Sequence, residues 1–387
     1  MEKKTSAYSG FHKLLIKERL KVLSDFCDLS YETIQIFEDL ATLAPERLVA
    51  IGENPISNYE LPLRLVNYFQ INKKWLYVPI AVEEASVVAG ACYASKVCGE
   101  VSAKVDKSKS YVVGQVQLIE VTDPEKAKNT ILENKRYLLD KANEKHNFSR
   151  AYDLEVKEFN LPLGKTLVVN LFIDPGDAMG TAVASEMGEV IAPELTKLTG
   201  YLYNARIISN YSGRLTWAEV RIPLDRLARE TKTDDNKTMR WSGEEVRDRI
   251  LWLYQWAEED PDRAVTHNKG IMNGVDGVAL ATGNDWRAVE IANARYAQRT
   301  GQYKPLSKWY SEGDFLVGEL EMLIPCGIVG GEIKRFPKAE KIIKEVLKVR
   351  SADELAEIMA GIGLVQNYAA LSMLATIGIS KGHRPFR

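Results

Sequence analysis

The order of segments between residues 110 and 213 constrains the fold more than any other feature of this sequence. Residues 111–121 have the composition of a strand, and Thr122-Asp123-Pro124 begins a helix with proline at the first helical position. Two strands, a second helix and a last strand follow, near 154–159, 166–173, 177–198 and 205–209. This β-α-β-β-α-β order is typical of a ferredoxin-like domain.

The rest of the chain is dominated by helical patterns. A length of 387 residues exceeds one domain of about 150, and the polar segment 104–110 predicts a domain boundary. The predicted fold class is therefore α+β: a mainly helical large domain, 1–109 and 214–376, with an inserted ferredoxin-like small domain, 110–213. Within the large domain we expect a hairpin at 69–80, a glycine-rich segment at 260–285, and helices at 83–98, 246–257, 285–297, 342–349, 354–360 and 364–375.

Composition and charge exclude several classes of protein. The 51 Lys and Arg residues nearly balance the 53 Asp and Glu residues, so no basic surface for nucleic acid is expected. The apolar stretches are about ten residues long, whereas a membrane span needs about 20. The four cysteines form no CxxC pair, and we predict no metal site. A cytoplasmic protein with neither nucleic-acid nor membrane partners is expected.

The segment 266–274 places Lys269 among glycines and apolar residues. A lysine in such surroundings is suited to stabilising an oxyanion, although a surface lysine on a turn has the same pattern. Asp285 stands just before a predicted helix, where it either caps the helix or orients the Lys269 ammonium.

Three further sites carry similar alternatives. Glu84 opens an apolar helix, so it either complements the helix dipole or acts as an acid of raised pKa. His383 follows two glycines near the chain end and is either solvated or a mobile proton donor. Residues 177–180 begin a helix whose free amides could bind a phosphate, or they only cap it. Neither GxGxxG nor GK[ST] occurs, which excludes the Rossmann and P-loop fingerprints.

Taken together, these motifs resemble 3-hydroxy-3-methylglutaryl-coenzyme A reductase, and more closely its class II branch, which lacks the membrane anchor of the eukaryotic branch. The resemblance runs almost end to end. It rests on VPIAVEEASVVAG (78–90), DAMG (177–180), ISN (208–210), DPDRAVTHNKGIMNGVDGVALATGNDWRAVE (260–290), GELEMLIPCGIVGG (318–331), GLVQN (363–367) and GH (382–383).

The resemblance implies the four-electron reduction of the thioester to mevalonate and coenzyme A with two NAD(P)H, in the mevalonate pathway of isoprenoid synthesis. Glu84 would protonate the carbonyl oxygen, and Lys269 would stabilise the oxyanion of the mevaldyl intermediates. Asp285 would hold the Lys–Glu network, and His383 would protonate the departing thiolate. The substrate-binding residues would be Ser86, Asn210, Arg263, Gln366 and Asn367.

The resemblance also implies a cofactor site in the small domain, a dimer and a flap. The cofactor contacts would come from Asp177, Met179, Gly180, Thr181 and His146. Because His146 and Lys145 stand where NADH-preferring relatives carry an acidic residue, NADPH is favoured over NADH. We expect a homodimer or higher even oligomer with active sites at the dimer interface. Residues 377–387 would begin a C-terminal flap whose remainder is absent.

Two other functions compete with this interpretation. The same residues could oxidise mevalonate with coenzyme A, in the catabolic direction. The chain could also be a catalytically silent acyl-coenzyme A binding protein, but the joint presence of Glu84, Lys269, Asp285 and His383 argues against that alternative.

Overall fold

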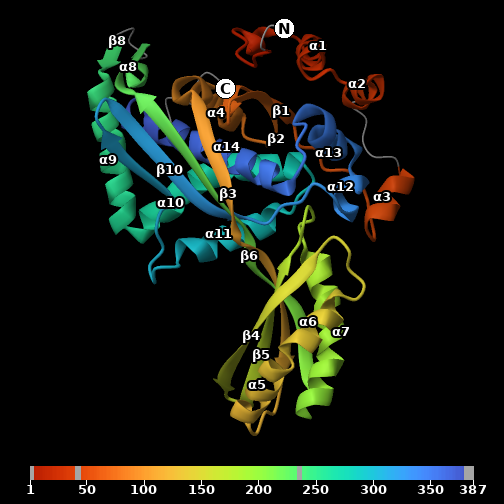
Figure 1. The fold of residues 1–387 in the computed structure, drawn as a ribbon. Coiled ribbons are helices and arrows are strands. Elements are labelled where there is room, and N and C mark those ends of the chain that lie inside the picture. Colours follow the sequence, from red (N-terminus) through yellow and green to blue (C-terminus); the bar gives the residue numbers. More distant parts are fainter. Residues whose placement is uncertain (1–3, 40–44, 233–237, 379–387) are drawn as a thin grey trace.

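The computed structural model describes residues 4–39, 45–232 and 238–378, and its fold is α+β, as predicted. Figure 1 shows a broad upper unit, which contains both the N-terminal and the C-terminal elements, and a narrower lower unit that projects from it. Two long strands, β3 (Glu100–Leu118) and β6 (Tyr203–Pro223), run through both units.

An eight-stranded sheet connects the two units, in the order β2-β1-β3-β6-β10-β9, with β5 on β3 and β4 on β5. The pairing of β1 with β3 is parallel, and the other pairings in this sheet are antiparallel. The remaining strands of the sheet are β1 (Leu63–Ile71), β2 (Lys74–Ala81), β4 (Arg150–Leu161), β5 (Gly164–Asp174), β9 (Ser307–Glu312) and β10 (Phe315–Ile324). The predicted hairpin at 69–80 is the end of the β1–β2 pair.

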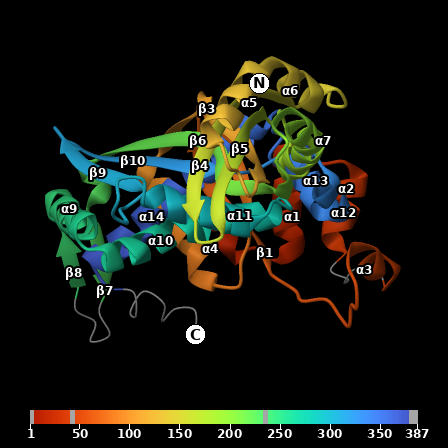
Figure 2. The ribbon, with the colours of Figure 1, turned by 90° about the horizontal axis from the view of Figure 1, so that it is seen from below.

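The lower unit has the element order that the sequence predicts. Its strands lie in the order β4-β5-β3-β6. Figure 2 shows the helices on one side of these strands. They are α5 (Pro124–Glu133), α6 (Lys135–Asn143) and α7 (Thr181–Thr199). The first predicted helix is therefore two helices that meet at Asn134. This unit has its own buried cluster, which includes Leu138, Leu171 and Met187.

The segment 104–110, predicted to be a domain boundary, is part of β3, which continues from the upper unit into the lower one. Lys104 pairs with Trp217 and Val105 with Thr216 on β6, and the register becomes irregular only between Asp106 and Tyr111. Polar side chains in this segment reflect solvent exposure of a strand whose backbone remains hydrogen-bonded.

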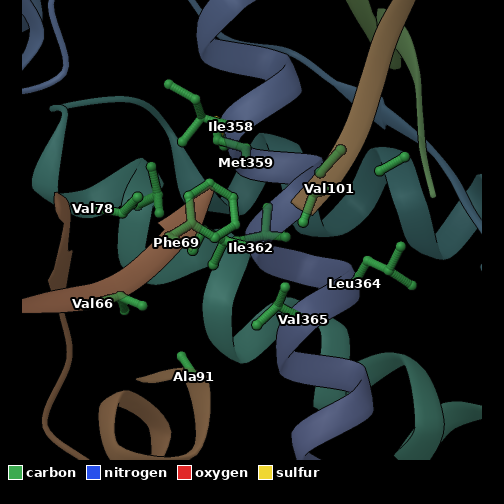
Figure 3. Close-up of a cluster of buried hydrophobic side chains, with 14 of the residues drawn as sticks. Val66, Phe69, Val78, Ala91, Val101, Ile358, Met359, Ile362, Leu364 and Val365 are labelled. Atoms are coloured by element: carbon green, nitrogen blue, oxygen red, sulfur yellow. The ribbon is translucent and has the colours of Figure 1, made fainter. Parts of the chain in front are cut away.

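Helix α14 (Ala352–Ala375) is the centre of the upper core, and the sequence pattern wrongly divided it into two helices. Gly363 lies between the two predicted helices, and a Cβ there would lie 2.8 Å from Val275 Cγ2, so this glycine permits close helix packing. Figure 3 shows Ile358, Met359 and Ile362 beside side chains of β1 and β3. Among the described residues α14 is the one helix long and apolar enough to cross a membrane. The apolar stretches predicted from the sequence were only about ten residues long, and this one was not identified. Since 83% of its apolar window is buried in the protein, it is a core helix.

Helix α10 (Pro261–Ala281) occupies most of the segment 260–285, which was predicted to be glycine-rich. A Cβ on Gly274 would lie 2.8 Å from Ile362 Cγ2, so the glycine lets α10 approach α14. Lys269 therefore projects from a rigid helix and not from a turn.

The other elements complete the upper unit. They are η1 (Phe11–Lys13), α1 (Ile16–Cys27), α2 (Tyr31–Glu38), α3 (Pro45–Ile51), α4 (Ala85–Cys98), α8 (Leu224–Leu227), β7 (Arg229–Lys232), β8 (Thr238–Trp241), α9 (Gly243–Glu259), α11 (Trp286–Ala297), α12 (Gly331–Arg335), α13 (Pro337–Lys341) and a π-helical turn, η2 (Ile342–Val346).

Candidate active site

Two predicted catalytic side chains, Glu84 and Lys269, lie next to each other. Glu84 precedes the first turn of α4, where it makes no side-chain capping bond, and its Oε1 accepts a hydrogen bond from the Ser86 hydroxyl at 2.6 Å. The Lys269 Nζ lies 3.8 Å from Glu84 Oε2, and the side chains are 63% and 41% exposed, so a ligand can reach both. A cation and a carboxyl placed together can stabilise and protonate an oxyanion.

Asp285 lies at the N-terminus of α11, where it caps the helix. Its Oδ1 accepts hydrogen bonds from the backbone N–H groups of Arg287 at 3.0 Å and Ala288 at 3.3 Å. The Arg287 guanidinium also pairs with both carboxylate oxygens, at 3.0 and 3.2 Å. The structure thus shows Asp285 with Arg287 and shows no contact between Asp285 and Lys269 or Glu84.

A hollow of about 570 Å³ brings Asp285 and Asn210 together. Asn210 lies on β6, and α11 supplies Trp286, Glu290 and Ile291 to the lining. The hollow is thus a second surface beside the predicted catalytic residues, formed by one strand and one helix.

Arg263, in the first turn of α10, is a buried cation with only 8% exposure. Burial lowers the pKa of its guanidinium, which lies 5.6 Å from the centre of the Trp256 ring. Among the described residues, no carboxylate forms a direct ion pair with Arg263, and the charge of Asp260 offsets the effect of burial on its pKa only in part. Since a desolvated cation is costly without an anion, this position is suited to a carboxylate ligand.

Gln366 and Asn367 differ in what they offer to a ligand. The buried Gln366 Oε1 has no hydrogen-bond partner among the described residues. Asn367 Oδ1 instead accepts hydrogen bonds from Ser307 Oγ at 2.9 Å and Trp309 Nε1 at 2.7 Å, and its Nδ2 lies 3.2 Å from His267 Nε2. Asn367 is thus engaged by α10 and β9, whereas Gln366 retains a free acceptor.

His267 is a buried residue that sequence reasoning did not single out. Its Nε2 lies 2.6 Å from Ser307 Oγ. Burial, with a smaller effect of the nearby Arg263 charge, lowers the His267 pKa to about 3, so the ring is neutral at physiological pH. His267 stands two residues before Lys269 in α10. Its contact with Asn367, which also bonds to Ser307, joins this part of α10 to α14 and β9.

Asp276 on α10 and Glu290 on α11 form a pair of carboxyl groups that the sequence pattern does not predict. Burial, together with the hydrogen bond and charge of Glu290, raises the pKa of Asp276 to about 9. Asp276 Oδ1 is buried and has no donor among the described residues. One carboxyl of the pair therefore carries a proton at neutral pH.

The Asp276 pKa predicts a pH dependence of stability. The unfolded chain releases this proton near its ordinary pKa of 3.8, while the folded chain holds it until about pH 9. Because the folded state binds more protons across that interval, the free energy of unfolding falls as pH rises through it and levels off above. We expect Asp276→Asn to raise Tm by several degrees at pH 8 and to have little effect at pH 4. Calorimetry of both proteins at pH 4 and pH 8 measures this. If Asp276→Asn changed Tm by the same amount at the two pH values, the raised pKa of Asp276 would be contradicted.

The predicted cofactor residues lie around the start of α7. This helix begins at Thr181, four residues later than predicted, and Gly180 precedes it with φ 93° and no side-chain cap. Asp177 Oδ1 accepts a hydrogen bond from the Ala352 N–H at 2.9 Å. The His146 Nε2 lies 3.8 Å from Glu186 Oε2. His383, with residues 379–387 of the predicted flap, lies outside the described residues.

Known proteins match the chain over nearly its whole length. The sequence profile of hydroxymethylglutaryl-coenzyme A reductase matches residues 15–387. The reductase of Archaeoglobus fulgidus is 37% identical over 98% of this chain and 85% of its own length. A probable reductase of Borreliella burgdorferi is 32% identical over 96% of this chain and 83% of its own.

Solved structures agree with these matches. A class II reductase from Streptococcus pneumoniae, bound to NADPH in open conformations, superimposes with a TM-score of 0.86. It is 35% identical, and the match covers 96% of this chain and 100% of that one. A second structure of the Streptococcus pneumoniae reductase gives a TM-score of 0.88 at 34% identity, over 98% of this chain and 90% of the other.

The fold and these matches define an NAD(P)H-dependent oxidoreductase that acts on an acyl-coenzyme A thioester. The chain belongs to the hydroxymethylglutaryl-coenzyme A reductase family, in its class II branch. Its activity is the reduction of hydroxymethylglutaryl-coenzyme A in the mevalonate pathway, and the comparisons do not favour the mevalonate-oxidising or silent alternatives.

Proposed function

We propose that Lys269 and Glu84 form the reacting centre, and the 3.8 Å approach of these two side chains carries the proposal. Reduction of a thioester to an alcohol places negative charge twice on one oxygen. The Lys269 ammonium stabilises that charge, and the Glu84 carboxyl donates a proton to the oxygen. The Ser86 hydroxyl, bonded to Glu84, orients the carboxyl. Two reduced nicotinamide cofactors, bound one after the other, would supply one hydride each.

Arg263 binds the free carboxylate of the hydroxymethylglutaryl group in this proposal. The support is the buried guanidinium without an ionic partner among the described residues. Ser86, Gln366 and Asn210 supply further polar contacts to the substrate. Asn367 was also predicted from the sequence to bind the substrate, but other side chains of this chain occupy its amide group. In this proposal it acts indirectly, by holding His267.

Asp285 and His383 complete the proposed set. Asp285 is paired with Arg287 in this structure. In this proposal it exchanges Arg287 for Lys269 and then orients the Lys269 ammonium. His383 protonates the thiolate of coenzyme A as it leaves. Because the pKa of a free thiol is about 8.5, protonation of the departing thiolate is favourable at neutral pH and disfavours its return to the carbonyl carbon.

We further propose that residues 110–213 are an inserted ferredoxin-like domain that binds NAD(P)H. The residues present fit a dinucleotide phosphate, because the uncapped N-terminus of the 19-residue α7 offers free N–H groups. Met179, Gly180 and Thr181 border those amides, and Asp177 holds the loop. Near His146, Lys145 favours a 2′-phosphate and hence NADPH over NADH.

A homodimer or higher even oligomer in the cytoplasm is the proposed working form. Lys269 and Glu84 are open to solvent in one chain. Large apolar side chains are also exposed on α9, α10 and α11, namely Trp252, Trp256, Val265, Trp286 and Ile291. A second copy that covers this surface would enclose the sites at the interface. Sedimentation equilibrium tests this, since a monomer at micromolar concentration would contradict it.

The reaction itself has a stoichiometric test. With hydroxymethylglutaryl-coenzyme A as substrate, the absorbance of NADPH at 340 nm and the released thiol are followed together. We expect two NADPH consumed per thiol released, because each hydride reduces the same carbon once. Parallel assays with NADH measure the cofactor preference. One cofactor consumed per thiol would contradict the full reduction to mevalonate.

A further inference from the structure

Arg214 is a buried arginine that joins three segments far apart in the sequence. It lies on β6 where the strand passes between the two units, and its side chain is 5% exposed. Its Nε donates to Asp353 Oδ1 at 3.0 Å, its Nη1 donates to the Cys326 carbonyl at 2.6 Å, and its Nη2 donates to the Gly176 carbonyl. The planar guanidinium reaches all three acceptors from nitrogens that are spread around its edge, a geometry that the compact ammonium of lysine does not reproduce.

The three partners of Arg214 lie on the proposed cofactor site or on elements that lead to the proposed active site. Gly176 begins the segment 176–180, hereafter the cofactor loop. Cys326 lies in the connection between β10 and α12, and Asp353 lies in the first turn of α14, which carries Gln366. Arg214 is thus the point where the cofactor loop meets the helix of the substrate-binding residues.

The cofactor loop is also joined directly to the segment after β10. The Ile328 N–H donates to the Asp177 carbonyl at 2.9 Å, and Ala178 and Val329 form a parallel bridge. A Cβ on Gly327 would lie 2.5 Å from the Met179 nitrogen, so only glycine allows this approach. These contacts fix the backbone of the cofactor loop against the upper unit.

The same contacts continue to α11. Asn284 Nδ2 donates to the Gly327 carbonyl at 3.1 Å, and the Gly327 N–H donates to Asn284 Oδ1 at 2.8 Å. Asn284 precedes Asp285, the residue that caps α11. A continuous set of hydrogen bonds therefore runs from Arg214 and the cofactor loop to the hollow that contains Asp285.

We propose that Arg214 is a positioning residue that sets the cofactor loop relative to the reacting centre; this rests on the proposed cofactor site. A buried ion pair contributes little net stability compared with apolar packing of the same volume. Its contribution here is geometric, because small displacements of a bound reactant reduce rate and affinity strongly. Arg214 touches neither Lys269 nor Glu84, so its effect appears in cofactor binding first.

Arg214→Lys tests the proposal, because it keeps the positive charge and removes the planar set of N–H donors of the guanidinium. NADPH binding is measured by its fluorescence without substrate, and KM is measured for both substrates. We expect the Kd and KM for NADPH to rise about tenfold. The KM for hydroxymethylglutaryl-coenzyme A should stay within twofold of that of the unsubstituted enzyme, and Tm within a few degrees of its value. The matched control is Arg221→Lys, on the same strand, whose exposed guanidinium pairs with Glu312 and leaves NADPH binding unchanged.

A second variant covers a failure of Arg214→Lys to fold. Asp353→Asn removes the charge of the Arg214 partner and leaves the backbone acceptors in place, so the same selective loss of NADPH affinity is expected at a smaller size. Equal rises of KM for both substrates together with a large fall in Tm, or unchanged NADPH binding in folded variants, would overturn the positioning role. If the unsubstituted protein binds no NADPH, the cofactor site itself is contradicted.

Discussion

Replacing Lys269 with methionine should reduce kcat by about two to three orders of magnitude, because a group that stabilises an oxyanion in an enclosed site is lost. The ammonium lies 3.8 Å from Glu84 Oε2 and projects from the rigid helix α10. Methionine keeps the length of the side chain and removes its charge. Since Lys269 is 63% exposed, its loss should leave Tm nearly unchanged. Steady-state kinetics with NADPH consumption as the readout measures the effect.

Lys344 supplies the matched control for this variant. Its side chain is also 63% exposed and pairs with a glutamate, Glu340, on a helix outside the proposed site. Lys344→Met should retain full activity. A Lys269→Met enzyme with kcat within tenfold of the unsubstituted enzyme would show that the oxyanion is stabilised elsewhere.

Replacing Glu84 with glutamine should reduce kcat by about 10²–10⁴-fold, because the amide cannot donate a proton to the carbonyl oxygen at neutral pH. The amide is nearly isosteric and can still accept the hydrogen bond from Ser86. The KM for hydroxymethylglutaryl-coenzyme A should therefore change little, which separates loss of an acid from loss of binding. Kinetics as a function of substrate concentration measures both quantities.

The adjacent residue, Glu83, supplies a matched control for the Glu84 variant. Glu83 is exposed and is the other acidic residue at the start of α4. Glu83→Gln should have nearly full activity. Equal losses in the Glu83 and Glu84 variants would indicate a general effect of negative charge at this helix terminus and not a specific acid.

The fold was predictable where local patterns and packing agree. The β1–β2 hairpin and the element order of the lower unit follow from alternation and from turn residues. The full length of α10 and α14 was not predicted, because glycine disfavours helices in isolation and here permits contact between two buried helices. The passage of β3 through 104–110 depends on pairing with β6, which is distant in the sequence.

The site was predictable mainly through family resemblance. Composition alone left Glu84 and Lys269 undecided, whereas the structure places them together. The pairing of Asp285 with Arg287 is a local contact that the motif did not reveal. His267, Asp276 and Arg214 were missed because their roles come from burial and from partners on other elements. No periodic pattern in one sequence encodes such contacts.

The central claim, that Lys269 and Glu84 act as one unit, is tested most directly by a double-mutant cycle. The kcat values of Lys269→Met, Glu84→Gln and the double variant are compared with the unsubstituted enzyme. Groups that act on the same oxygen are not additive, so the double variant should be about as slow as the slower single variant. If the two losses multiply in the double variant, the residues act independently and the proposed pair is wrong.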